Sequence, residues 1–187
     1  MTTARPLRAD AQRNRARVLA AAERVFAERG TAASTEEVAR AAGVGVGTVF
    51  RHFPSKEALL QALVVQRLAR GAADARDHAT SPDAGAAFFD CFTAVVHGSA
   101  TKLELVDALA ELGTEPNEAV APVAADVTEA LTALLQQAQH AGAVRRDIDV
   151  RDVIALLAGA SQAHRYAPDD RPLAGHSAHS LRVPIAQ

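Results

Sequence analysis

The sequence predicts an all-α fold, and three observations support this prediction. Alanine, the residue with the highest helix propensity, makes up about a quarter of the 187 residues. Val, Ile, Tyr and Phe never form the alternating runs that a half-buried strand requires. Apolar residues instead recur at spacings of three and four along much of the chain, as they do on one face of a helix. A chain of this length can form one domain or two small ones around a real core.

The first expected helix spans residues 10–29. Its buried stripe is formed by apolar residues at helical spacing: Val18, Ala22, Val25 and Phe26. Gly30 follows directly and is well placed to end the helix. Residues 1–9 contain two arginines and little apolar content, so we expect them to form a flexible basic arm.

Two short helices joined by a tight turn are predicted from Ser34 onwards. Ser34 and Glu37 have the spacing of a capping box, in which the serine oxygen accepts an N–H of the first turn and the carboxylate reaches back. Gly43 can adopt the positive φ with which a helix commonly ends. Val49 and Phe53 lie one turn apart on the second helix and are expected to pack inward. This is the pattern of a helix-turn-helix, whose second helix lies in a DNA groove.

Further helices are expected in the rest of the chain. Pro54-Ser55 ends the second short helix, and Ser55 is a natural N-cap for a long helix that runs toward His78. Apolar periodicity predicts the remaining helical segments over residues 86–98, 102–112, 122–141 and 150–166. Prolines and glycines interrupt any period after that, so the tail over residues 168–187 is expected to be irregular.

The charge is unevenly distributed along the chain. Residues 1–56 contain ten Lys and Arg against five Asp and Glu, whereas residues 57–187 contain ten against seventeen, within a net charge of −2. A basic N-terminal part beside an acidic remainder is typical of a protein that meets a polyanion with one end. Chance unevenness is the alternative.

Several classes of protein are disfavoured. Cys91 is the single cysteine, which leaves neither an internal disulfide nor a zinc site built on cysteines. No N-terminal run resembles a signal peptide, and no apolar stretch approaches about 18 residues, so we expect a cytoplasmic protein without a membrane partner. His176 and His179 are three residues apart but lack further ligands, so no metal is expected.

Catalysis is also not expected. The chain contains neither a GxSxG elbow nor an HExxH motif. The glycines between residues 43 and 47 resemble a phosphate-binding loop, but such loops follow a strand, whereas here a helix precedes. We therefore expect neither an enzyme nor a cofactor.

A set of local motifs extends over residues 15–63. It consists of Phe26 before Gly30, the helix and turn from Ser34 to Gly43-Val44, Gly47-Thr48-Val49-Phe50, and Phe53-Pro54-Ser55-Lys56-Glu57. With these motifs the sequence resembles the TetR family of transcriptional regulators. The resemblance implies a three-helix DNA-binding domain over residues 1–53. It also implies a helical domain over residues 54–187 that dimerises and binds a ligand.

The resemblance also implies which residues contact DNA. They are Ser34, Thr35, Gly45, Val46, Gly47, Thr48, Phe50, Arg51, His52 and Lys56. Those expected to face phosphates are Ser34, Thr35, Thr48 and Lys56. A helix N-terminus attracts anions, which gives a physical reason for the first two.

The predicted reading helix departs from the family pattern. Gly45 replaces a common capping serine, and Phe50 replaces a tyrosine whose hydroxyl would contact phosphate. Val46 makes no hydrogen bond, although its methyl groups can contact a thymine methyl. Direct readout is therefore expected to depend on Arg51 and His52, or on the basic arm, with DNA shape as a further contribution.

The C-terminal part offers a candidate ligand pocket. Its expected lining is Phe88, Phe89, Phe92, Val96, Leu105, Leu109, Leu131 and Leu135. Ordinary core packing is the alternative for each of them. The last helix is expected to form a dimer interface through Val153, Ile154, Leu157, Gly159, Ala160 and Ser161. A helix buried within its own chain is the alternative.

The expected function is that of a homodimeric repressor of a double-stranded DNA operator, released by an unidentified small-molecule effector. Two alternatives remain open. One is a ligand-independent dimeric DNA-binding protein with a structural C-terminal bundle. The other is a helical-bundle enzyme or cofactor carrier.

Overall fold

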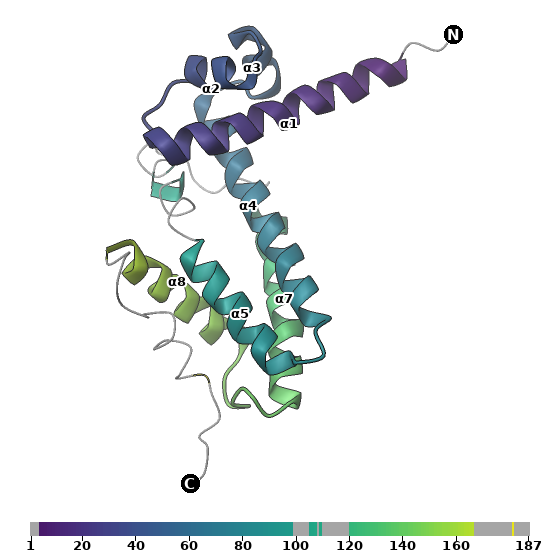
Figure 1. Ribbon diagram of the computed structural model, residues 1–187, viewed down its shortest axis with the longest axis vertical. Coiled ribbons are helices and arrows are strands. Elements are labelled where there is room, and N and C mark those ends of the chain that lie inside the picture. The colour runs from purple at the N-terminus through teal and green to yellow at the C-terminus, as the bar shows by residue number, and fades with distance from the viewer. Residues whose placement is uncertain (1–3, 99–104, 108, 110–119, 167–180, 182–187) are drawn as a thin grey trace. The chain divides into compact units, whose positions relative to one another are not determined.

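The computed structural model describes residues 4–98, 105–107, 109, 120–166 and 181. These residues contain the helices α1 (Ala4–Arg29), α2 (Thr35–Ala42), α3 (Val46–His52), α4 (Lys56–Ala79), α5 (Ala84–His97), α7 (Val120–His140) and α8 (Val150–Tyr166) (Figure 1). No β-strand occurs in the described part, which confirms the all-α prediction. None of the described helices is both long and apolar enough to cross a membrane.

The chain divides into two compact units. The first comprises residues 1–65 with 104–115, and the second comprises residues 66–103 with 116–187. The division therefore falls within α4, about two fifths of the way along that helix, whereas the sequence places a boundary just before it.

Helix α1 begins earlier than expected. It starts at Ala4, so the prediction of a flexible arm is wrong for residues 4–9. The segment contains alanine, leucine and arginine, which all favour helix. Pro6 lies in the first turn, where its missing N–H would have no helical partner in any case.

The first unit is built on α1, which packs against both α2 and α3. The predicted stripe on α1 is buried, as are Val49 and Phe53, and these expectations are confirmed. The beginning of α4 adds Leu59, Leu60 and Leu63 to the buried residues of this unit. Its N-cap is the predicted one, because the Ala58 N–H donates to Ser55 Oγ at 3.2 Å.

The second unit packs α5, α7 and α8 against one another. Its apolar cluster includes residues of all three helices and two alanines, Ala72 and Ala75, from α4. Leu181 also belongs to this cluster and is only 1% exposed. The expected irregularity of the tail otherwise concerns residues outside the described part. The sequence pattern gave no signal that Leu181 would be a core residue.

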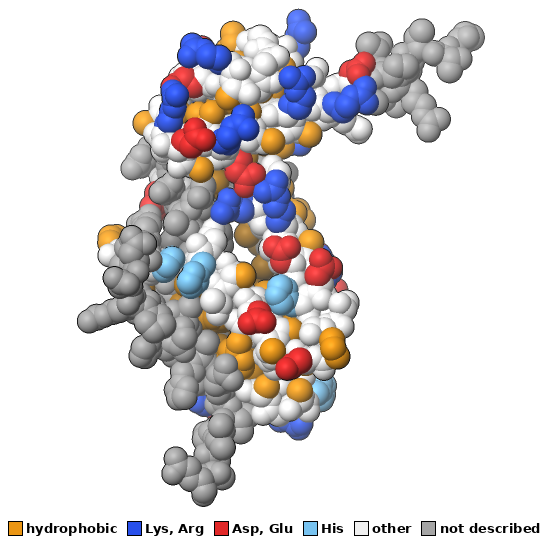
Figure 2. Space-filling model, in the orientation of Figure 1, with side chains coloured by type: hydrophobic (Ala, Val, Ile, Leu, Met, Phe, Trp, Pro, Cys, Tyr) orange, Lys and Arg blue, Asp and Glu red, His pale blue; other side chains and the backbone are white. Residues whose placement is uncertain are grey.

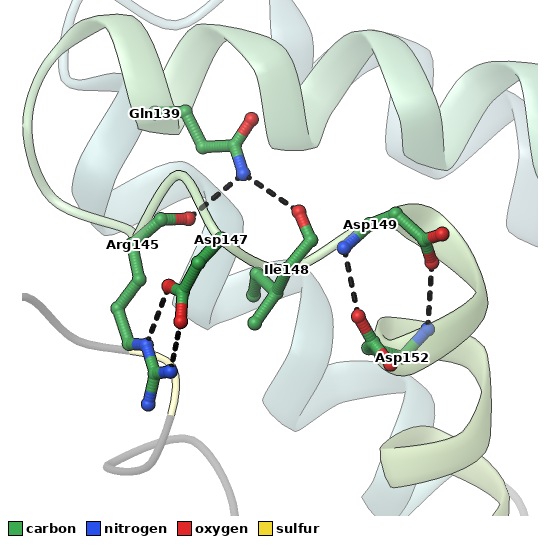
Figure 3. A network of polar contacts seen from close by, with 6 residues as sticks. All are labelled: Gln139, Arg145, Asp147, Ile148, Asp149 and Asp152. Atoms are coloured by element: carbon green, nitrogen blue, oxygen red, sulfur yellow. Dashed lines mark hydrogen bonds and ion pairs between the residues drawn. The ribbon is translucent and has the colours of Figure 1, made fainter.

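The turn between α7 and α8 is fixed by polar contacts (Figure 3). Gln139 Nε2 donates to the carbonyls of Arg145 at 2.8 Å and of Ile148 at 3.1 Å. The Asp149 N–H donates to Asp152 Oδ2 at 2.8 Å, and the Asp152 N–H donates back to Asp149 Oδ1 at 3.2 Å. These reciprocal bonds satisfy N–H groups at the start of α8, which begins and ends at the residues predicted from the sequence.

Candidate functional site

The geometry of the helix-turn-helix begins with the N-terminus of α2. The Glu37 N–H donates to Ser34 Oγ at 3.2 Å, and the Ser34 N–H donates to Glu37 Oε2 at 2.8 Å. Both halves of the predicted capping box are therefore formed. Gly43 ends α2 with a φ of 64°, a conformation that side-chain-bearing residues rarely adopt. These two local features set the length of α2 and the direction of the turn into α3.

Arginines of α1 hold the two short helices in place. Arg17 Nη2 donates to the Ala42 carbonyl at 2.8 Å, at the C-terminus of α2, where positive charge is favoured. Arg29 Nη1 pairs with Glu37 Oε1 at 2.5 Å. The Arg15 guanidinium lies 5.1 Å from the centroid of the Phe53 ring. No local sequence pattern indicates these contacts, because each partner lies eight or more residues away along the chain.

Two carboxylates occupy the N-terminus of α2. The N–H of Ser34 and the guanidinium of Arg29 hold the pKa of Glu37 below its ordinary value. The pKa of Glu36 is lowered by its own backbone N–H and then by the Ser34 side chain. Negative charge at this helix end is therefore already supplied from within the chain. Thr35 is 9% exposed, so a phosphate at this end would approach mainly through the Ser34 hydroxyl.

The lowered pKa of Glu37 predicts a pH dependence of stability. A carboxyl whose pKa is lower in the folded state stabilises that state above its unfolded pKa, near 4.5, and this contribution is lost as the pH falls through the folded value. Glu37→Gln should therefore be less stable than wild type at pH 7, and the difference should shrink between pH 5 and 3. Urea unfolding across this range measures it.

The control for this prediction is Glu28→Gln, because Glu28 is an exposed carboxylate of α1 outside the capping box. We expect it to leave the stability at pH 7 nearly unchanged. A constant difference between wild type and Glu37→Gln from pH 7 to pH 3 would contradict the role given to the capping carboxylate.

Helix α3 has one buried and one exposed side. Val49 faces inward, and Phe53, the C-cap residue that follows the helix, is also buried. The outward side carries Val46, 39% exposed, Phe50, 42% exposed, and the exposed Arg51. The predicted DNA-contacting positions of this helix are therefore available at the surface of the first unit.

The remaining predicted residues flank this outward side. Gly45 is the N-cap of α3 and makes no side-chain cap, as its lack of a side chain requires. Thr48 and His52 are half-buried, and Gly47 is exposed. Lys56 begins α4, and its Nζ lies 6.0 Å from the centroid of the Phe26 ring. The aliphatic part of this side chain therefore packs near the core. Their contacts with DNA stay predictions.

Positive side chains gather on the first unit (Figure 2). Residues 43–56 contain Arg51, His52 and Lys56 and no acidic residue. A surface of this kind attracts the phosphates of DNA, whereas base edges are read by side chains that enter a groove. The arrangement therefore combines a short exposed helix with a basic surrounding.

The second unit contains a small apolar cavity of about 10 Å³. It is lined by Phe88, Cys91, Phe92, Val95, Leu131, Leu134, Val153 and Leu157. Burial raises the pKa of the Cys91 thiol to about 11, so this residue contributes an uncharged, weakly polar surface. The space is about that of one water and far below the roughly 300–1,000 Å³ of a typical ligand pocket.

The structure brings together only part of the predicted pocket lining. Phe88, Phe92 and Leu131 line the cavity. A second group belongs to the same buried cluster without lining the cavity: Phe89, Val96 and Leu135. A third group, Leu105 and Leu109, is buried but falls in the first unit. Among the described residues, no three His, Cys, Asp or Glu side chains gather as a metal site.

Comparison with known proteins gives consistent matches to one family. Residues 18–63 match the family model described as "Bacterial regulatory proteins, tetR family". Residues 83–181, more than half of the chain, match the model described as "Transcriptional regulator SbtR-like, C-terminal domain".

Relatives align over most of the chain. The crystal structure of a TetR transcription regulatory protein from Mycobacterium vanbaalenii is 39% identical, with a TM-score of 0.76, covering 95% of this chain and 100% of that one. The regulator SCO0520 from Streptomyces coelicolor is 30% identical, with a TM-score of 0.67, covering 91% and 99%. The HTH-type transcriptional regulator UidR of Escherichia coli is 29% identical over 160 residues, 81% of this chain and 79% of UidR. The chain belongs to the TetR family of DNA-binding transcriptional regulators.

Proposed function

We propose that this regulator is a homodimeric repressor that binds a specific double-stranded DNA operator through α3 and is released by a small-molecule effector. The observation that carries the DNA-binding part is the outward side of α3, with Val46, Phe50 and Arg51 exposed beside a basic surface. A regulator of this kind acts on chromosomal DNA, so the proposed site of action is the cytoplasm.

Within this proposal, residues of the first unit have distinct roles. Arg51 reads a base edge, because an arginine fork paired with guanine is the commonest specific contact in the major groove. Lys56 and Thr48 contact phosphates and fix the position of α3 on the duplex. Ser34 contacts a phosphate through its hydroxyl at the start of α2. Thr35 is nearly buried and contributes less to this contact.

Dimerisation is supported by α8 and by the geometry of operators. Ile154 and Gly159 of the predicted interface in this helix are exposed, whereas its other members are buried within the chain itself: Val153, Leu157, Ala160 and Ser161. The exposed side is therefore the part available to a second copy. Paired reading helices match half-sites about one helical turn apart, which a monomer cannot engage together.

Release by an effector follows as a shift between two populations. A ligand that binds better to one arrangement of the second unit favours that arrangement. Helix α4 contributes residues to both units, so a change in its position is the natural route from an effector to the reading helices. The cavity of about 10 Å³ would have to open for this to occur.

That small cavity favours a second candidate function, a dimeric DNA-binding protein whose C-terminal bundle binds no effector. The two are separated by titrating the protein–operator complex with apolar small molecules whose binding is first established by a raised melting temperature. The repressor proposal expects such a compound to weaken operator binding. Unchanged operator affinity at saturation would favour the second candidate.

Two substitutions test the assignment of base and phosphate contacts. Arg51→Lys keeps the charge but loses the fork geometry, so we expect about a 5- to 150-fold loss on the operator and little change on random DNA. Lys56→Ala should weaken both duplexes alike and reduce the slope of log K against log salt by about one. Fluorescence anisotropy over a range of salt concentrations measures both effects.

The control is Arg146→Ala, which removes an exposed positive charge from the second unit. We expect it to alter neither operator affinity nor salt slope. If Arg51→Lys lost as much affinity for random DNA as for the operator, Arg51 would be a phosphate contact and its role as a base reader would be wrong.

A further inference from the structure

The outward side of α3 is apolar at two positions one helical turn apart. Val46 and Phe50 are among the few large hydrophobic residues with such exposure in the described part of the chain. A single exposed apolar side chain is ordinary on a protein surface. Two at positions i and i+4 of a seven-residue helix lie next to each other on its surface, and so form a small continuous apolar surface.

The glycines beside Val46 point to a close approach by a partner. A Cβ added at Gly45 or at Gly47 would meet nothing within 4 Å. Gly45 has a φ of −70°, and neither glycine is among those with positive φ. Inside a helix, glycine is less favourable than alanine because it loses more backbone freedom on folding. Glycine is one of the preferred N-cap residues, which is reason enough for Gly45. The chain's own fold gives no such reason for Gly47 inside the helix, and space for a second molecule does.

The charge around this surface identifies the partner as DNA. Arg51 is exposed and directly follows Phe50 in α3, Lys56 follows at the start of α4, and no acidic residue occurs from residue 43 to residue 56. Valine and phenylalanine have neither donors nor acceptors in their side chains. Among the base edges exposed in the major groove, the C5-methyl group of thymine is the one that offers an apolar contact.

We propose that Val46 and Phe50 together form a contact for thymine C5-methyl groups, so that each operator half-site carries a T·A pair where α3 enters the groove. This inference rests on the proposed function, in which α3 lies in the major groove. Val46 and Phe50 are then specificity-determining residues, and they select thymine by apolar contact while Arg51 supplies the hydrogen bonds. The missing side chains of Gly45 and Gly47 allow the valine methyl groups to reach the base edge.

The test uses operator duplexes in which each thymine in turn is replaced by deoxyuridine. This exchange removes the methyl group and leaves the Watson–Crick pairing unchanged. We expect about a fourfold loss of affinity at one or two positions of each half-site, equivalent to about 0.8 kcal/mol for a buried methyl-sized group. Other thymines should show no loss.

Protein variants assign the effect to these side chains. Because Val46 and Phe50 are exposed, Val46→Ala and Phe50→Ala should fold normally, which circular dichroism and urea unfolding verify. The ratio of the affinities for the thymine and deoxyuridine duplexes should fall to near one in at least one of these variants. Val106→Ala is the matched control, since Val106 is 42% exposed and lies outside α3, and it should keep the full difference.

Each outcome bears on the inference in a defined way. Sensitive positions that lose their sensitivity in a variant of α3 support it. Specific operator binding with no sensitive thymine overturns it and leaves the proposed function standing. Sensitivity that persists unchanged in both variants overturns it as well. A folded protein with no preference for any duplex overturns the proposed function, and this inference with it.

Discussion

Replacing Phe26 with alanine is expected to lower the free energy of unfolding of the first unit by about 3–5 kcal/mol. Phe26 is fully buried, on a helix that packs against both α2 and α3. Its ring also lies beside the Lys56 side chain at the start of α4, with the Lys56 Nζ 6.0 Å from the ring centroid. The cavity left by alanine would therefore weaken the support of α3. Because many domains are stable by only about 5–15 kcal/mol, operator binding should be lost or strongly reduced.

Phe50→Ala is the matched comparison for Phe26→Ala, since the same atoms are removed from an exposed position of the same unit. We expect it to change stability by less than about 0.5 kcal/mol and to weaken operator binding all the same. Urea unfolding followed by circular dichroism, combined with anisotropy titrations, separates the two effects. Equal losses of stability in the two variants would contradict the assignment of Phe26 to the core and Phe50 to the surface.

Leu181→Ala is expected to destabilise the second unit by about 2–5 kcal/mol. The side chain is buried in the cluster formed by α5, α7 and α8, and the Leu181 carbonyl accepts the Arg145 N–H at 3.1 Å. Leu181 therefore connects the end of the chain with the turn before α8. Thermal and urea unfolding of the full chain measure the effect.

Ile154→Ala controls for this experiment because it shortens a similar aliphatic side chain on the exposed side of α8. We expect it to cost much less stability than Leu181→Ala. Because Ile154 lies on the side proposed for dimerisation, its effect on stability should shrink as the protein is diluted below the dimer dissociation constant, whereas that of Leu181 should not. Equal, concentration-independent losses would contradict the separate roles given to the two residues.

Much of the fold could be predicted from the sequence because its signals are local. The capping box at Ser34 and Glu37, the left-handed Gly43 and the N-cap at Ser55 each act within one helical turn. The start of α1 was mispredicted because the missing apolar periodicity of residues 4–9 outweighed their high helix propensity. Apolar periodicity identifies a helix only where apolar residues recur along one face of it, and residues 4–9 contain no such pattern.

The tertiary roles of several side chains could not be predicted. Arg17 caps α2 across 25 residues, and no local pattern indicates such a bond. The burial of Leu181 likewise depends on packing against distant helices. Among the predicted pocket residues, helical spacing identified buried side chains correctly, but it could not separate Phe92, which lines the cavity, from Leu105, which falls in the other unit.

The sequence predicted which residues form the candidate DNA-binding surface, but not how exposed each of them is or which charges surround them. The sequence identified the residues of α3, and the structure adds that Val46, Phe50 and Arg51 face outward together. It also adds that Glu36 and Glu37 already occupy the N-terminus of α2. Phosphate contacts are therefore expected to depend more on Lys56 and less on the start of α2.

A footprint of the wild-type protein on the DNA upstream of its own gene tests the central claim most directly, because it reports which base pairs the protein covers. We expect a protected segment with two related half-sites about one helical turn apart, and protection that weakens as salt is raised. Arg51→Lys should lose this protection at protein concentrations where Arg146→Ala keeps it. Uniform protection along the fragment, or the same protected segment with Arg51→Lys as with wild type, would contradict specific reading of DNA by α3.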